Sequence, residues 1–269
     1  MKHLTKTLIL SASLMAGIFT QVQSAELPSG DEIARNINAR DEGIAVSRHL
    51  KMEMTDRHGK LRVRETRAFR KYFGDEKRTV IFYLKPKNIK DTAFLTYDYA
   101  DNAKDDDQWL YLPAMRKVRR ISASDRGDYF LGTDLSYEDI KLETRVSLKD
   151  YTRKTIAEDE VDGFHCYVVE ETAIDTETAE ELGHLRRESC VDDNLWIVRR
   201  SKFWDPQNKL LKTTYFKDIS EVQGILTAHI IEVENHKTGH QTRFTFSDVN
   251  YQEGVNDRVF TQNALKRGL

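Results

Sequence analysis

Two histidines, His236 and His240, stand four residues apart, the spacing that places two metal ligands on one face of a helix. Gly239 and the extended segments on either side favour a turn instead. The third and fourth ligands that complete a usual site are not nearby in the sequence. We therefore expect no metal here.

Acidic residues gather between positions 101 and 107, in the run Asp-Asn-Ala-Lys-Asp-Asp-Asp. The run lacks the glycine and the terminal glutamate of an EF-hand calcium loop. It predicts a solvated acidic loop that joins two strands.

Nucleophilic catalysis needs a nucleophile beside a base and an orienting group. The sequence contains no Gly-x-Ser-x-Gly elbow, and carboxylates such as Glu42, Glu53 and Glu65 are spread too evenly for one acid and base pair to stand out. The residues predict a protein that is not an enzyme and uses no cofactor. An envelope enzyme whose site leaves no visible signal is the weaker alternative.

The two cysteines, Cys166 and Cys190, predict a disulfide bond, which is typical of exported proteins. An antiparallel hairpin with Cys166 opposite Cys190 also sets Val168 opposite Glu188 and Glu170 opposite Arg186, so that one register joins the sulfurs and pairs opposite charges. Two unpaired buried thiols are the alternative.

The first 24 residues have the pattern of a secretory signal peptide. Lys2 and Lys6 precede an apolar run at 8–19, and small residues end the segment at Ser24. The run is shorter than the roughly 20 residues that a spanning helix needs. No cysteine stands near the cleavage point for lipid attachment. We expect a signal peptide at 1–24 and an exported, soluble single domain at 25–269, since no linker divides the rest.

The composition argues against wholesale nucleic-acid binding. Charged residues make up 32% of the chain, the net charge is -2, and the mean hydropathy is -0.63. Lys2 and Lys6 carry the only formal charges of the signal segment, so cleavage leaves a charge of -4. A nucleic-acid-binding domain is usually basic instead.

Alternating and turn-bounded segments predict a mainly β protein. The expected strands are 47–56, 61–73, 78–86, 92–100, 108–113, 117–122, 163–171, 195–205, 209–219, 225–235 and 242–251. Two short helices are expected, one capped by Ser29 or Asp31 and one that places Phe260, Ala264 and Leu265 on one face. A wide sheet covered by so little helix should keep an apolar groove on its concave side, which is the usual form of a ligand site.

The stretch 105–140 carries Trp-x-Tyr-x-Pro at 109–113, followed by Arg-Lys-x-Arg-Arg at 116–120. With DTAFLTYDYA, SKFWDPQNKLLKT and DRVFTQNALKRG, it resembles the periplasmic outer-membrane lipoprotein-sorting proteins, relatives of the carrier LolA, from about Ile33 to Leu265. The resemblance implies an open antiparallel half-barrel of the LolA/LolB type, with short helices over an apolar concave face.

The same resemblance implies a periplasmic carrier of acyl chains. It implies an inner-membrane transporter of the RND type as a partner and an outer-membrane acceptor as another. The arginine-rich hairpin and the cysteine pair are not features of LolA itself, so a lipoprotein and another lipid both remain open as cargo. The alternative function is an accessory protein that docks on a transporter or envelope complex and carries nothing.

Candidate binding residues come from the same stretch. We expect the cavity or its rim to include Trp109, Leu110, Tyr111, Leu112, Met115, Phe130, Leu131 and Trp196. The basic residues Arg116, Lys117, Arg119 and Arg120 would meet an anionic head group or a partner, because arginine binds phosphate through its planar fork.

Two alternatives stay open for this stretch. The basic residues could instead pair with Glu138, Asp139 and Glu143 on a solvated face. The loop between Gly127 and Gly132 could be a lid, a docking loop, or a loop folded onto the core.

Overall fold

The computed structural model describes residues 26–101 and 104–269, so the predicted signal peptide lies outside the described residues. Within these ranges the chain forms one antiparallel sheet of 13 strands in the order β6-β5-β4-β3-β2-β1-β13-β12-β11-β10-β9-β8-β7. The two edge strands do not pair with each other, so the sheet is open. The predicted mainly β, open half-barrel fold is confirmed.

The strands are β1 (Ala45–Thr55), β2 (Leu61–Phe73), β3 (Glu76–Lys85), β4 (Ala93–Asp98), β5 (Asp107–Leu112), β6 (Lys117–Ile121), β7 (Tyr151–Val161), β8 (Phe164–Ala173), β9 (Arg186–Asp192), β10 (Val198–Trp204), β11 (Leu210–Val222), β12 (Ile225–Asn235) and β13 (Gln241–Asn250). The α-helices are α1 (Gly30–Ala39), α2 (Tyr137–Leu142), α3 (Thr176–Leu182) and α4 (Gln262–Arg267), and the 3-10 turns are η1 (Pro113–Met115), η2 (Ala123–Asp125), η3 (Phe130–Gly132) and η4 (Asp257–Val259).

Strand β3 shows how the sheet is covered on both sides. Its residues are buried almost without a break from Thr79 to Tyr83, as expected for a strand with structure on both faces. Ile81 and Tyr83 pack into the core that contains α2, whereas Val80 and Phe82 pack into the core that contains α4. We call the α2 side the inner face and the α4 side the outer face.

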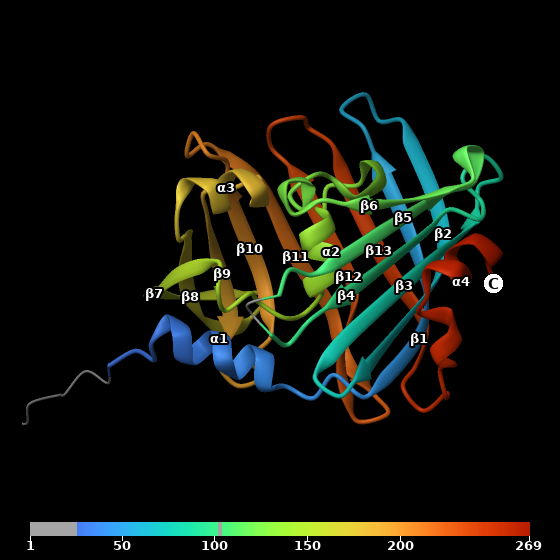
Figure 1. Cartoon of the computed structure of the whole chain (residues 1–269). Helices are drawn as coiled ribbons and strands as arrows, with labels where there is room; N and C mark the ends of the chain where they lie inside the picture. The colour runs from blue at the N-terminus through green and yellow to red at the C-terminus, as the bar shows by residue number, and fades with distance from the viewer. Residues whose placement is uncertain (1–25, 102–103) are drawn as a thin grey trace, which may run out of the picture.

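The inner face is covered by residues 126–150, which we call the cover segment. It includes η3 and α2 and joins β6 to β7. Figure 1 shows α2 lying between strands β10 to β13 and strands β4 to β6. Phe130 and Ile140 of this segment pack against the inner core. Gly127 is required at its close approach to α3, because an added Cβ would lie 2.4 Å from the backbone of Leu182.

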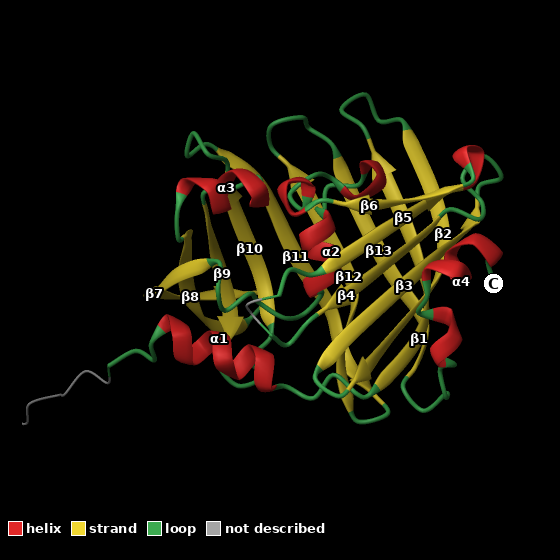
Figure 2. Ribbon diagram, viewed as in Figure 1, coloured by secondary structure: helices red, strands yellow, loops and turns green. Residues whose placement is uncertain are grey.

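The outer face is covered by the C-terminal part of the chain. Phe260, Ala264 and Leu265 are buried, as the sequence pattern predicts, and α4 contacts β4, β5 and β6. Phe260 meets Phe73 edge to face at 5.6 Å. Figure 2 shows α4 and α1 near opposite ends of the sheet.

Helix α1 begins where the sequence predicts, with Ser29 as its N-cap rather than Asp31. Ile33 and Ile37 pack with Val169 and Val191 over strands β8 and β9. The expectation of two helices was wrong by two, since α2 and α3 also form. Both are short enough that their few apolar residues show little period in the sequence.

The disulfide between Cys166 and Cys190 is present, with its Cα atoms 5.4 Å apart. The predicted register was wrong by two residues. Cys190 pairs with Val168, and Cys166 with Asp192, so the bridge runs diagonally between β8 and β9. The predicted opposition of Glu170 and Arg186 is also replaced, by Glu170 opposite Glu188 and Thr172 opposite Arg186. Arg186 still reaches Glu170 diagonally at 3.4 Å, because diagonal neighbours lie within reach of a long side chain.

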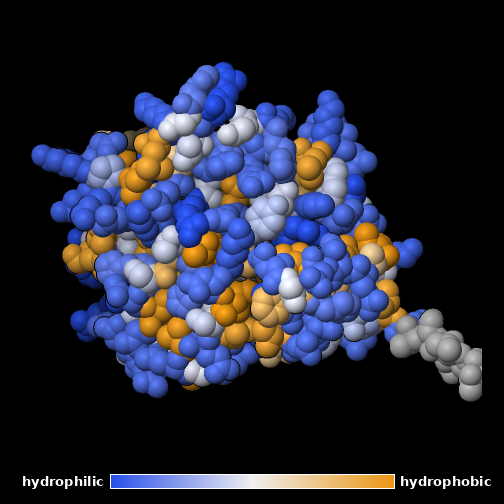
Figure 3. All heavy atoms as spheres, turned by 180° about the vertical axis from the view of Figure 1, so that it is seen from behind, coloured by the Kyte–Doolittle hydropathy of each residue, from blue (hydrophilic) through white to orange (hydrophobic). Residues whose placement is uncertain are grey.

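The surface is largely polar. Figure 3, which views the molecule from behind, shows polar side chains over most of the face, with apolar patches mainly in its lower half. This distribution agrees with the high content of charged residues.

Candidate functional site: a cavity with an apolar end and a charged end

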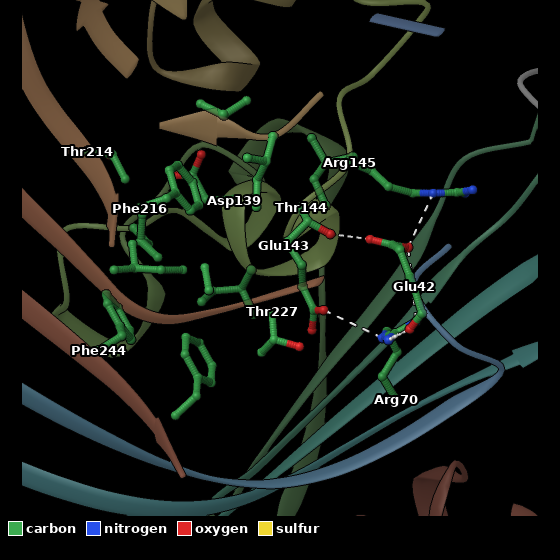
Figure 4. A pocket seen from close by; sticks show the side chains of 18 of the residues that line it. Glu42, Arg70, Asp139, Glu143, Thr144, Arg145, Thr214, Phe216, Thr227 and Phe244 are labelled. Carbon is green, nitrogen blue, oxygen red and sulfur yellow. Dashed lines mark hydrogen bonds and ion pairs between the residues drawn. The ribbon is translucent and has the colours of Figure 1, made fainter. Parts of the chain in front are cut away.

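A cavity of about 120 Å³ lies between the inner face and the cover segment. Its apolar wall includes Leu50, Ile81, Ile140, Phe203, Phe216 and Phe244. Figure 4 shows Phe216 and Phe244 on one side of the cavity and Glu42, Arg70 and Arg145 on the other. The site is therefore amphipathic.

The apolar end of the site is built by alternation along the strands. Leu50 of β1 and Phe244 of β13 belong to the inner core, together with Ile81 of β3. Residues that point to one face of a strand recur at every second position, so these separate strands deliver their side chains to one surface. Ile140 closes the surface from the opposite side, since it lies on α2.

Helix α2 is fixed at its start by a capping box. The Ser136 hydroxyl accepts a hydrogen bond from the Asp139 backbone N–H at 3.0 Å, and the Asp139 carboxylate accepts one from the Ser136 N–H at 2.8 Å. This arrangement satisfies two backbone donors that a helix start otherwise leaves without partners.

Two buried ion pairs hold α2 against the sheet. Lys212 of β11 reaches the Asp139 carboxylate at 2.5 Å, and Lys141 of α2 reaches Asp106 at 2.5 Å. Lys141 also contacts Glu138 at 2.9 Å. Both lysine side chains are almost completely buried. The cover segment is thus attached by charge on two sides of its helix.

The charged end lies just beyond the C-terminal end of α2. Glu143 accepts from Arg48 at 2.5 Å and lies 3.7 Å from the Nε of Arg70. Glu42 is 3.4 Å from the Nε of Arg145 and also accepts hydrogen bonds from Tyr72 and Thr144. Figure 4 shows Glu42 lying among Arg70, Thr144 and Arg145, with Glu143 directed toward Arg70.

Glu42 stays ionised in this setting. Burial by itself would raise the pKa of its carboxyl, but Lys77 and Arg70, aided by the hydroxyls of Thr144 and Tyr72, lower that pKa to about 2. Burial would likewise lower the pKa of Arg70, but Glu143 and Glu42 raise it. Glu42 and Arg70 therefore both carry their charges at neutral pH.

The eight residues predicted for the cavity or its rim lie elsewhere than on this cavity's wall. Leu110 and Phe130 are buried in the inner core, with Leu112 and Leu131 packed against it. The other four divide between the outer core (Trp109 and Tyr111), the core under α1 (Trp196) and the surface (Met115, 60% exposed). Phe130 is fully buried, so its loop is folded onto the core here.

The predicted basic residues lie at the open edge of the sheet. Arg120 pairs with Asp107 at 2.6 Å, and Arg119 lies 4.0 Å from Asp125. Arg116 and Lys117 are exposed.

The alternative pairing with Glu138, Asp139 and Glu143 was wrong. Each of these acids has an interior partner instead: Lys141 for Glu138, Lys212 for Asp139, and Arg48 for Glu143. All three acids lie in or just after α2, which the sequence analysis did not recognise.

The sequence analysis also missed the arginines of the charged end. Arg70 is 3% exposed, whereas Leu61 on the same strand is 53% exposed. Residues alternate between the two faces of this strand. The face that begins with Leu61 and Val63 has the more apolar composition at its start, so composition favours that face as the buried one. The only available signal was that Arg70 continues the series Thr66, Ala68 on the face that proves to be buried.

The structure holds the candidate metal residues in ordinary contacts. His240 lies 2.5 Å from Asp134, and His236 lies 2.8 Å from the hydroxyl of Thr213. In the part of the chain that the structure describes, no group of three or more His, Cys, Asp or Glu side chains could hold a metal ion. Over the same residues, no helix combines the length and the apolar character needed to cross a membrane.

Comparisons with known proteins give both a family and a fold. A family model whose description reads "Uncharacterized protein" matches residues 75–267. A DUF1329 family protein from Desulfovibrio piger is 28% identical, with a TM-score of 0.79 over 88% of this chain and 97% of that chain. A putative outer membrane lipoprotein-sorting protein domain from Vibrio parahaemolyticus is 28% identical, with a TM-score of 0.80 over 88% and 98%.

A LolA superfamily protein from Nitrosomonas europaea shares the fold, with a TM-score of 0.66 at 19% identity over 88% of this chain and 100% of that chain. No curated protein matches the chain. The resemblance predicted from the sequence is confirmed.

Proposed function

Because the chain belongs to the DUF1329 family and has the LolA fold, we propose that it binds the acyl chain of a lipid or lipid-modified protein in the inner-face cavity and carries it between the membranes of the envelope. The proposed cycle makes and breaks no covalent bond and uses no cofactor.

The observation that carries this proposal is the apolar cavity beneath a separate cover segment. Burial of each methylene group of a ligand contributes about 0.8 kcal/mol. A chain of ten or more methylenes would therefore gain substantial free energy by leaving water for this surface. The cover segment supplies Ile140 to the cavity wall and Phe130 to the adjoining inner core.

The size of the cavity indicates how loading must proceed. Its volume of about 120 Å³ is below the roughly 300–1,000 Å³ of typical ligand pockets. A long acyl chain fits only if the cover segment moves outward and the chain replaces its apolar side chains. In this proposal, the structure is the closed state of the carrier.

The relatives support a role in the envelope. The Vibrio protein is described as a putative outer membrane lipoprotein-sorting protein domain. By analogy, the signal segment at 1–24 would direct this chain to the periplasm. An inner-membrane transporter of the RND type would serve as one partner and an outer-membrane component as the acceptor.

A cavity-filling variant tests the proposal. Ala228 lines the cavity, whereas Ala114 is exposed at the tip of the β5–β6 hairpin. Titration with a dansyl-labelled fatty acid should raise the dansyl emission of the wild type. Ala228→Trp should abolish that rise and Ala114→Trp should preserve it. Equal binding by both variants would argue against this cavity as the carrier site.

A second candidate function is docking without cargo. The observation that favours it is the exposed tip of the β5–β6 hairpin, where Met115 is 60% exposed beside the exposed Arg116 and Lys117. An apolar side chain flanked by cations suits a partner or a membrane surface. If the chain only docks, the wild type should not bind the dansyl-labelled fatty acid, and Met115→Ser with Lys117→Gln should impair lipid transport in cells. Acyl binding by the wild type, or normal transport in the variant, would contradict this function.

A further inference from the structure

We propose that the charged end of the cavity binds a phosphate-bearing head group, so that the cargo is an anionic amphiphile. This inference rests on the proposed carrier function and names the chemical class of its cargo. The head group would lie among Arg48, Arg70 and Arg145, and the acyl chain would extend toward Phe216 and Phe244.

Three arginines lie at the charged end of the cavity, beside Glu42 and Glu143. All three line it, and their side chains are only 15%, 3% and 32% exposed. Arg48 and Arg70 come from the adjacent strands β1 and β2, and Arg145 comes from the segment after α2, which is distant from both in the sequence. The planar guanidinium of arginine can bind a phosphate through two parallel hydrogen bonds, whereas the ammonium group of lysine acts as a point charge. A cluster of arginines therefore suits a phosphate group.

The internal carboxylates satisfy these arginines only in part. Glu42 and Glu143 supply two negative charges to three guanidinium groups. The buried Nε atoms of Arg48, Arg70 and Arg145 make no hydrogen bond among the described residues, although Glu143 lies 3.7 Å from that of Arg70 and Glu42 lies 3.4 Å from that of Arg145. Because buried donors are nearly always paired in native proteins, these incompletely satisfied donors, and the Nε of Arg48 above all, indicate a position for a further ligand oxygen.

Glu143 is placed to exchange with an anion. It follows α2 directly, and it adopts φ 56, which is uncommon for a residue other than glycine. Such a conformation persists only where the surroundings impose it. Its contacts with Arg48 and Arg70 supply that constraint.

Opening of the cover segment would draw Glu143 away from both arginines, since the residue is continuous with α2. Unpaired buried cations are costly. A phosphate arriving with an acyl chain would restore the lost negative charge, and its removal would allow Glu143 to return. Head-group binding and closure of the cover segment therefore compete for the same two arginines.

The arrangement of the cavity also matches one amphiphile in one orientation. Phe216 and Phe244 lie opposite the charged group in Figure 4. The Arg48 guanidinium lies 4.8 Å from the centre of the Phe246 ring, so the boundary between the two ends is an arginine stacked on an aromatic wall.

The test compares two lipids with the same acyl chain. Affinities of the full mature chain are measured for 1-palmitoyl-lysophosphatidic acid, for monopalmitoylglycerol, and for inorganic phosphate alone. We expect the wild type to prefer the phosphate lipid over the neutral lipid by about tenfold or more. We expect inorganic phosphate to bind much more weakly than the phosphate lipid, because it has no acyl chain to bury.

Two double variants with the same change in charge locate the head group. Arg48→Gln with Arg145→Gln should reduce the preference for the phosphate lipid to near unity while monopalmitoylglycerol still binds. Arg116→Gln with Arg119→Gln, on the exposed edge hairpin, should keep the full preference. Thermal melts establish that each variant folds.

Glu143→Gln should change the affinity for the phosphate lipid in the opposite direction. Removal of the internal competitor should raise the affinity for the phosphate lipid several-fold, although it weakens closure. A purely structural role for Glu143 predicts no gain in affinity, so the absence of a gain contradicts the exchange.

The remaining outcomes each overturn a defined part of the account. Equal affinity of the wild type for both lipids removes the anionic head group and leaves the carrier function intact. Failure of both lipids to bind removes the carrier function as well. Inorganic phosphate binding as tightly as the phosphate lipid assigns the arginines to a small solute. Loss of preference only in the edge-hairpin variant moves the head group to that hairpin.

Discussion

Asp139 on α2 and Lys212 on β11 form an ion pair of 2.5 Å across the inner face of the sheet. The Lys212 side chain is 4% exposed and also donates to the backbone carbonyl of Asp134 at 3.3 Å. Burial would raise the pKa of the Asp139 carboxyl, but Lys212 lowers it. Lys212 and Phe216 lie on the same strand, β11, and Phe216 lines the apolar end of the cavity. The ion pair therefore links the cover segment to the strand that forms this end of the cavity.

Asp139→Asn should loosen α2. The change leaves Lys212 buried without its counter-charge, and loss of one partner of a buried pair costs about 3–5 kcal/mol of unfolding free energy. Chemical denaturation should show the loss, and hydrogen exchange should show faster exchange of the amides of α2. Glu232→Gln is the control, because its partners Lys217 and Arg243 are 40% and 45% exposed and such surface pairs contribute at most about 1 kcal/mol each. Equal losses in the two variants would contradict the special role of the α2 pair.

Phe130→Ala should destabilise the closed state strongly. Phe130 is fully buried and contacts Phe94 at 5.1 Å and Tyr137 at 5.5 Å between ring centres. Truncation of a buried phenylalanine costs about 3–5 kcal/mol. Phe164→Ala is the matched control, since that ring is 47% exposed. A loss no larger than the control's, measured by denaturant unfolding, would mean that the loop with Phe130 is not held on the core in solution.

His184 should make the protein less stable in mild acid. Its Nδ1–H donates to the carbonyl of Leu182 at 3.1 Å, and its Nε2 accepts from the Tyr151 hydroxyl at 2.8 Å, which together describe the neutral ring. Burial, with Lys212 and Arg187, lowers its pKa from 6.5 to about 4.

The sign of this effect follows from which state binds the proton. Between pH 6.5 and 4 the unfolded chain binds a proton at His184 and the folded chain does not, so the stabilising effect is complete above pH 6.5 and is lost as the pH falls to 4. The largest change in unfolding free energy that this one histidine can cause is about 3 kcal/mol. His184→Gln should flatten this part of the stability curve, whereas His165→Gln, at an exposed site, should leave it in place. An unchanged slope in the His184 variant would refute the assignment.

Removal of the disulfide should lower stability without changing ligand preference. The bridge closes a loop with a sequence separation of 24, for which chain entropy predicts about 3 kcal/mol. It joins β8 and β9, and neither cysteine lines the cavity. Cys166→Ser with Cys190→Ser should therefore show a lower melting temperature and the same lipid selectivity. A changed selectivity would show that this end of the sheet shapes the cavity.

Much of the fold could be predicted because its signals are local. The β5–β6 hairpin follows from alternation that stops at Pro113, and α1 follows from the cap at Ser29. Register is less local, since shifting the β8–β9 pair by two residues keeps every side chain on its face. The sequence predicts the disulfide from the two cysteines of an exported chain, but the charge pairing used for the register could not distinguish the correct pairing from its neighbour.

The cavity was harder to predict because its parts are brought together only by tertiary structure. Helix α2 has the Ser-x-x-Asp start signal at Ser136, but it buries Glu138 and Lys141, which composition assigns to the surface. Arg70 is likewise buried against expectation, because its partners Glu42 and Glu143 come from other segments of the chain. Pairing across the fold, which no single segment records, decides where these charges lie.

Native mass spectrometry of the protein isolated from the periplasm of its own host without detergent tests the central claim most directly. The account predicts one phosphate-bearing acyl lipid per protein, recovered in a lipid extract of the same sample. A ligand-free mass that stays unchanged after incubation with extracted envelope lipids would contradict the carrier function.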